Sequence, residues 1–185
     1  MATLVRELHI RLNPNEEQKK VLGRLGRQYA VLCNQIADIA RADDDIKSAP
    51  QLSVVASEKL KGQVDIPWRY VNLASIAVMR TLRRDRDYVW PAGDVIPPVD
   101  LDTKMASIKG DCKITDAPSW SLSIAAGEDE RTVVPCEVEV VGGAAGSKAG
   151  GARLYWMYGD MWEVRVAVNV DEIVALKADY TAMTE

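Results

Sequence analysis

Residues 4–12 read Leu4-Val5-Arg6-Glu7-Leu8-His9-Ile10-Arg11-Leu12. From Glu7 onward, apolar residues occupy the even positions and polar residues the odd positions, which is typical of a strand with one buried face. Asn13-Pro14-Asn15 then ends the strand. A lone strand needs partners, so the fold depends on where the remaining strands lie in the sequence.

Helices are predicted directly after this strand. Residues 16–41 carry apolar residues at steps of three and four, which indicates a long amphipathic helix, and Asn13 or Asn15 is its expected N-cap. Two shorter helices are predicted next, one over 51–61 after Pro50 and one over 68–87 after Ile66-Pro67.

The pattern changes to short β-branched runs from residue 94 onward. The predicted strands are 105–115, 120–125, 132–141, 152–158 and 161–170. Since the first strand has its only possible partners there, we expect an α+β fold, a small antiparallel β-barrel with an inserted helical domain. The expected domains are 1–13 (first barrel strand), 14–92 (inserted helical domain), 93–175 (rest of the barrel) and 176–185 (tail). The glycine- and alanine-rich residues 142–151 predict a flexible linker.

Composition favours a soluble cytoplasmic protein without a membrane partner. The chain has no apolar run of 18 or more residues, and charges at Arg6, Glu7 and Arg11 argue against a signal peptide. Net charge is +4 over residues 1–90 and −8 over residues 91–185. This charge split is consistent with one half of the chain facing phosphate. A net charge of +4 over 90 residues is small, however, and the split is equally consistent with having no functional role.

Cysteine and histidine content argues against a disulfide framework or a zinc site. Cys33, Cys112 and Cys136 are widely spaced, and His9 is the only histidine. We therefore expect buried thiols in a reducing compartment and no metal or cofactor. His9 has no partner nearby in sequence and is interpreted as a surface histidine.

Four segments, in this order, carry a resemblance to a known family. They are Ile10-Arg11-Leu12-Asn13-Pro14-Asn15-Glu16-Glu17-Gln18 with Asn34 in the following helix, Ile66-Pro67 leading to Val71-Asn72-Leu73-Ala74, Trp120-Ser121-Leu122-Ser123-Ile124 through Val133-Val134-Pro135, and Arg153-Leu154-Tyr155-Trp156 through Trp162-Glu163-Val164-Arg165-Val166. Together they cover most of residues 4–170. The chain resembles the N-terminal region of TnpB/OrfB-type transposon-encoded RNA-guided nucleases and the related miniature type V CRISPR effectors.

The resemblance implies a barrel called the wedge with an inserted recognition domain. In the family this pair grips the guide RNA scaffold, the guide–target heteroduplex and the DNA motif beside the target. A RuvC-like nuclease domain follows in the family, whereas only Asp171-Glu172 and a stretch to Glu185 follow Val170 here. One carboxylate such as Asp171 cannot hold two metal ions. We therefore expect no catalytic site in this chain, with cleavage supplied by a partner nuclease or absent.

The candidate nucleic-acid contacts are basic residues and one asparagine. On the third predicted helix they are Arg69, Arg80, Arg83, Arg84 and Arg86, and a second basic zone holds Arg6, Arg11, Lys19, Lys20, Arg24 and Arg27. Arginines on one face can pair phosphates without reading sequence. The alternative for the first group is a solvated helix end whose arginines pair with Asp85 and Asp87. The alternative for the second zone, and above all for Lys19 and Lys20, is the ordinary polar face of an amphipathic helix. Asn34 is a candidate base contact or a locally bonded residue.

Aromatic residues flank the arginine helix at Trp68, Tyr70 and Trp90. They suit either stacking on unpaired bases or anchoring in the core. The predicted function is binding of RNA, DNA or their hybrid. The alternative is a protein-interaction module, an inhibitor or a phage or mobile-element accessory protein, that docks through an acidic barrel.

Overall fold

The computed structural model describes residues 5–102, 104–111, 119–127, 130–141, 152–157 and 160–169. The chain forms two compact units. The barrel unit comprises Met1–Pro14, Asp102–Ile124 and Val133–Glu185, and the helical unit comprises Asn15–Leu101 and Ala125–Thr132. None of the described helices has both the length and the apolar character that crossing a membrane requires.

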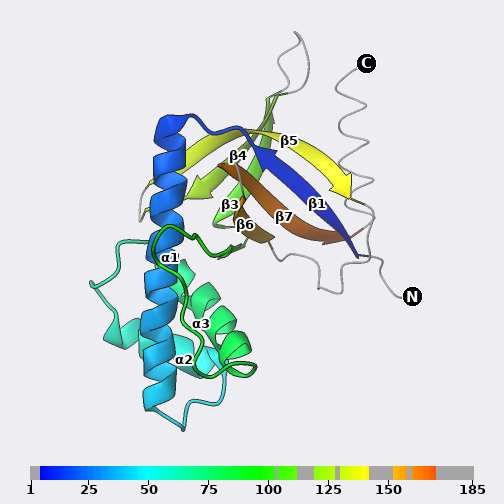
Figure 1. The fold of residues 1–185 in the computed structure, drawn as a ribbon. Helices are drawn as coiled ribbons and strands as arrows, with labels where there is room; N and C mark the ends of the chain where they lie inside the picture. Colours follow the sequence, from blue (N-terminus) through cyan, green and yellow to red (C-terminus); the bar gives the residue numbers. More distant parts are fainter. Residues whose placement is uncertain are drawn as a thin grey trace. The chain divides into compact units, whose positions relative to one another are not determined.

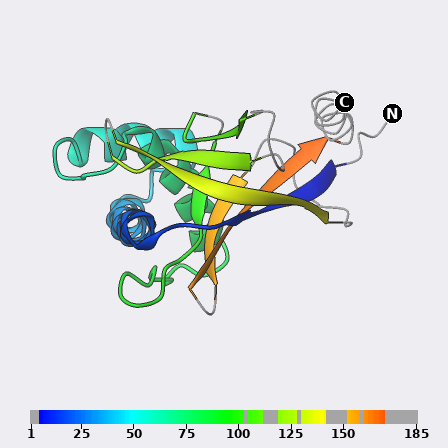
Figure 2. The same ribbon diagram turned by 90° about the horizontal axis from the view of Figure 1, so that it is seen from above.

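Six strands are seen among the described residues of the barrel unit. They are β1 (Val5–Leu12), β3 (Ala106–Asp111), β4 (Ser119–Ala125), β5 (Arg131–Val141), β6 (Ala152–Met157) and β7 (Met161–Asn169). Their order across the antiparallel sheet is β6-β7-β1-β5-β4-β3, and the sheet curls into a nearly closed barrel (Figures 1 and 2). The expected α+β class with a small antiparallel barrel is confirmed.

Strand β1 lies between two strands from the end of the chain. Ile10 is opposite Val138 of β5 and opposite Val164 of β7, with both pairs antiparallel. The N–H of Asn13 extends the pairing by donating to the carbonyl of Pro135 at 2.8 Å. The first strand therefore completes the sheet with late strands, as its alternation predicted.

Alternation also places the apolar side chains of the barrel on one face. Ile10 and Val164 are fully buried, and Leu12, Leu154 and Trp162 are nearly so. Burying large aliphatic and aromatic side chains is the main source of the barrel's stability. Two expectations, the linker over 142–151 and the tail over 176–185, lie outside the described residues.

Three helices and one short strand belong to the helical unit: α1 (Glu16–Ala42), α2 (Ala49–Lys59), α3 (Arg69–Leu82) and β2 (Val99–Leu101). Asn15 is the N-cap of α1, because its Oδ1 accepts from the Gln18 N–H at 2.9 Å while the Gln18 Oε1 accepts from the Asn15 N–H at 2.8 Å. This reciprocal pair satisfies two backbone donors that the helix cannot satisfy itself. The strand β2 was not predicted.

The apolar face of α1 builds the core of this unit with α3. Tyr29 and Tyr70 are both at most 1% exposed, and their rings meet edge to face with centroids 5.9 Å apart. α3 packs against both α1 and α2 (Figure 1). The other fully buried large residues of α1 and α2 are Leu22, Leu25, Leu32, Ile36 and Leu52.

Residues 86–100, here called the return segment, run back along α1 toward its N-terminus. Arg41 donates to the carbonyls of Arg86 (2.9 Å) and Tyr88 (2.6 Å), so it holds the beginning of the segment. The side chain of Asn34 binds the backbone of Trp90 twice, donating to its carbonyl at 2.9 Å and accepting from its N–H at 2.8 Å.

The far end of the return segment is held closer to the start of α1. A Cβ atom on Gly26 would lie 2.1 Å from Cγ2 of Ile96, so only glycine permits this close approach. The hydroxyl of Tyr29 donates to Asp100 at 3.3 Å. Residues of α1 thus contact the return segment at its beginning, middle and end.

Burial protects the two described cysteines. Cys33 is fully buried in the helical unit and Cys136 is 6% exposed in the barrel unit, while Cys112 lies outside the described residues. Burial raises the pKa of the Cys136 thiol to about 11 and raises the pKa of the Cys33 thiol further. The reactive thiolate is therefore scarce at both positions near neutral pH.

Alkylation of these two cysteines is expected to require unfolding. At pH 8 a thiol with the raised pKa of Cys136 is ionised in about one molecule in a thousand, so iodoacetamide should label it at least ~100-fold more slowly in the native protein than in urea. Peptide mass mapping separates the three cysteines. Rapid native labelling of Cys33 or Cys136 would contradict the burial of that thiol.

Candidate nucleic-acid interface

The arginine cluster consists of Arg80, Arg83, Arg84 and Arg86 at the end of α3. The helix was predicted to continue to residue 87, but it ends at Leu82, so this boundary was wrong. The N–H groups of Arg84 and Asp85 both turn back to the carbonyl of Thr81, at 2.9 and 3.0 Å. The Asp85 carboxylate then accepts from the N–H of Asp87 at 3.1 Å and fixes a turn.

Two of the four arginines pair with carboxylates. Arg80 lies 3.6 Å from Asp100, and Arg86 lies 2.8 Å from Asp44. The Arg86 and Asp44 side chains are 67% and 82% exposed, so their pair contributes at most about 1 kcal/mol to stability. A phosphate could replace such a partner at little cost in stability.

Arg83 and Arg84 are exposed, and neither side chain has a hydrogen-bond or ion-pair partner within the described part of the chain. Asp85 and Asp87 lie beside them in the turn without pairing to them. These two guanidinium groups are the cations of the cluster that are open to a phosphate from solvent.

Arg69, the remaining arginine of the third helix, begins α3 and is half-buried. Exposed side chains continue from it along one face at steps of three and four, namely Asn72, Ile76, Arg80 and Arg83. Arg69 is thus on the same face as the arginine cluster but near the other end of the helix.

The second basic zone divides between the two units. Arg24 and Arg27 are exposed on α1, and Arg24 pairs with Glu130 at 2.5 Å. Arg27 extends over Gly23. Arg11 is exposed on β1 in the barrel unit, opposite Glu137 on one side and Glu163 on the other in the strand register.

Lys19 and Asn34 have partners within the helical unit. Lys19 pairs with Glu16 at 2.8 Å, Lys20 is exposed, and the side chain of Arg6 lies outside the described part. Both polar groups of the Asn34 amide bind Trp90 of the return segment. A base contact by Asn34 stays a prediction, and it would require this backbone pair to open.

The three aromatic residues around α3 have different environments. Tyr70 is fully buried and donates to the carbonyl of Ala125 at 2.9 Å, and Trp90 is 6% exposed. Both are core residues. Trp68, in contrast, is 45% exposed.

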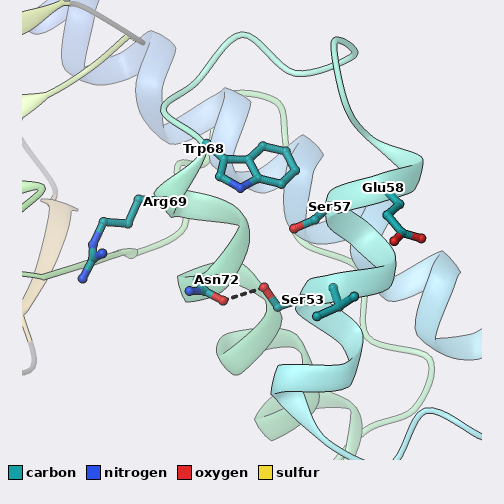
Figure 3. A pocket seen from close by; sticks show the side chains of 7 residues that line it. Ser53, Ser57, Glu58, Trp68, Arg69 and Asn72 are labelled. Atoms are coloured by element: carbon teal, nitrogen blue, oxygen red, sulfur yellow. Dashed lines mark hydrogen bonds between the residues drawn. The ribbon is translucent and has the colours of Figure 1, made fainter.

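A cleft lies between α2 and α3 beside Trp68 (Figure 3). Its volume is about 600 Å³. It is lined by Ser53, Val54, Ser57, Glu58, Trp68, Arg69 and Asn72. The sequence did not reveal this cleft, since its walls come from two helices whose packing no local pattern specifies.

His9 has a partner that the sequence did not reveal. Its Nδ1 lies 3.2 Å from Oε1 of Glu163, which also accepts from Nε of Arg165 at 2.6 Å. The guanidinium of Arg165 in turn lies 4.6 Å from the centre of the Tyr155 ring. The neighbouring sequence could not indicate this partner, because the carboxylate lies on a strand 154 positions away, and the His9 side chain is still 21% exposed.

This cluster neutralises a buried carboxylate, since Glu163 is only 6% exposed. Within the described residues no three histidine, cysteine or acidic side chains are grouped closely enough to hold a metal ion. Asp43, Asp44 and Asp45 form a loop in which Asp43 accepts from the N–H of Asp45 at 3.0 Å.

No protein-family model and no curated protein sequence matches the chain.

Proposed function

We propose that this chain is a nucleic-acid-binding module that grips RNA or an RNA–DNA hybrid through its helical unit. It would form the non-catalytic part of a TnpB-like or type V CRISPR-like system, with cleavage supplied by a partner. The observation that carries the proposal is the pair of exposed arginines, Arg83 and Arg84, between Arg80 and Arg86 at the end of α3.

Chemistry supports phosphate as the ligand of this cluster. Guanidinium groups bind phosphate oxygens in a bidentate manner and hold a strand without reading its bases. Arg83 and Arg84 need to break no side-chain partner in the described part of the chain to do so, and Arg86 needs to break only an exposed pair with Asp44. Arg80 keeps Asp100 beside it and is expected to contribute less.

The order of elements also supports the proposal. One strand precedes three helices, and the remaining strands of the same barrel follow them. The wedge of TnpB-type proteins with its inserted recognition domain is expected to have this order, which is consistent with the proposal.

Replacing Arg83 and Arg84 by alanine is expected to weaken binding of a structured RNA by about tenfold or more at low salt. Each lost phosphate contact lowers the slope of log K against log salt by about one, so the slope should fall by about two. Fluorescence anisotropy at several salt concentrations measures both quantities, with an RNA–DNA hybrid of equal length as a second ligand.

A matched control instead removes two lysines, one at the end of α2 and one just after it. Lys59→Ala with Lys61→Ala makes the same change in net charge at exposed positions outside the cluster, and its slope should stay close to that of the unaltered protein. Equal losses in both double variants would show a general charge effect. Failure of the unaltered protein to bind nucleic acid would overturn the proposal and favour a protein-interaction module.

A further inference from the structure

The cleft between α2 and α3 has an exposed indole on one wall and polar groups around it (Figure 3). Trp68 is 45% exposed, whereas Trp90 and Trp162 are 6% and 2% exposed. A tryptophan side chain that stays in water forgoes the free energy that burying its large apolar surface would give. An exposed aromatic ring on the wall of a cleft is therefore a candidate for contact with a ligand. A flat ring on the wall of a cleft suits a flat ligand.

Two polar side chains of the cleft, Ser53 and Asn72, are hydrogen-bonded to each other. The Ser53 hydroxyl donates to Oδ1 of Asn72 at 2.5 Å, and Ser53 is itself 8% exposed. This bond determines which way the Asn72 amide faces, so its Nδ2 is the group left to donate to a ligand. A carboxamide donor beside an aromatic ring is suited to the acceptor atoms on the edge of a nucleobase.

Charges of opposite sign stand on the two helices that line the cleft. Arg69 follows Trp68 at the start of α3, and Glu58 lies near the end of α2. In Figure 3 the Arg69 side chain extends from α3 away from Trp68 and α2. A phosphate is attracted by Arg69 and repelled by Glu58, so the phosphate of a nucleotide in the cleft would lie outside the cleft, on the α3 side. A cleft of about 600 Å³ is within the range of sites that hold small molecules.

We propose that this cleft holds one unpaired nucleobase of a bound strand, stacked on Trp68, with Arg69 on the adjoining phosphate and Asn72 on the base edge. This inference rests on the proposed function and adds to it a preference for unpaired nucleotides. Arg80 lies eleven residues beyond Arg69 on the same helix, about 16 Å at the helical rise. A strand leaving the cleft along α3 therefore reaches the arginine cluster.

The test compares a single-stranded RNA of twelve nucleotides with a fully paired duplex of the same length. Stacking of one base on an aromatic ring contributes about 1–3 kcal/mol, so Trp68→Ala should weaken single-strand binding by roughly 5- to 150-fold. Duplex binding should change by less than twofold, because a paired base is not free to enter the cleft. Trp68→Phe should retain most of the single-strand affinity.

A second variant leaves Trp68 in place and fills the cleft. Ser57→Phe puts a ring on the opposite wall, as Figure 3 shows for the position of Ser57, and should lower single-strand affinity in the same selective manner. Circular dichroism confirms that each variant is folded.

The outcomes separate this inference from the proposed function. If neither oligonucleotide binds the unaltered protein, the proposed function fails. If the unaltered protein binds both and the two variants bind both equally well, only the cleft inference is overturned, and docking of a protein segment there would replace it. An equal loss for the single strand and the duplex would also overturn it.

Discussion

Replacing Ile10 by aspartate is expected to unfold the barrel unit. Ile10 is fully buried on β1, between strands β5 and β7. A carboxylate at this position loses its hydration and gains no partner on the apolar face, which costs several kcal/mol. Since a domain of this kind has a total stability of about 5–15 kcal/mol, one such substitution removes most of it. The near-ultraviolet circular dichroism of buried Trp162 should disappear.

A conservative change at the same position is the control. Ile10→Val keeps the alternation of β1 and removes one methylene, so it should cost only about 0.5–1.5 kcal/mol. Urea unfolding followed by circular dichroism measures both variants. An Ile10→Asp protein that unfolds at nearly the same urea concentration as the Ile10→Val protein would show that β1 is not central to the barrel.

Local sequence patterns predicted the elements that depend on periodicity. The alternation of residues 7–12 predicted β1, and the three- and four-residue spacing of 16–41 predicted α1 almost to its observed end at Ala42. In both, one face is buried along the whole element, so the apolar residues repeat with the period of the element itself. The barrel could then be predicted, because the only predicted strands that could pair with β1 lie after the helices in the sequence.

Other features depend on contacts between residues far apart and could not be predicted. Nothing around Asn34 indicates that its amide binds Trp90, which is 56 positions away. The end of α3 was missed because arginine is compatible with a helix, while the turn depends on where the Asp85 side chain bonds. Trp68 differs from Trp90 only in what packs over it, so its exposure depends on tertiary structure.

In the helical unit, we expect a large loss of stability when Tyr29 is replaced by alanine. This side chain is 1% exposed, meets the ring of Tyr70 edge to face, and donates to Asp100 at 3.3 Å. Tyr29→Ala leaves a cavity and removes the aromatic pair, which together should cost about 3–5 kcal/mol. It also removes the hydroxyl that holds the end of the return segment to α1. Urea unfolding followed by the far-ultraviolet circular dichroism of the helices measures the decrease in the free energy of unfolding.

Tyr29→Phe separates packing from hydrogen bonding, since it keeps the ring and loses only the hydroxyl. Its expected cost is about 0.5–1.5 kcal/mol at neutral pH. Burial, with negative charge nearby, raises the pKa of Tyr29 above its usual value of 10.0. The unfolded chain therefore ionises this group first as the pH rises above 10, which favours unfolding, and phenylalanine cannot ionise.

The stability advantage of the unaltered protein over Tyr29→Phe should therefore be constant below about pH 9 and decrease as the pH rises above 10. Lysines and the other tyrosines titrate in both proteins and cancel in the difference. A difference that stays constant from pH 7 to pH 11 would contradict burial of a protonated hydroxyl at Tyr29. In that case the end of the return segment would be held by the ion pair of Asp100 with Arg80 rather than by its hydrogen bond with Tyr29.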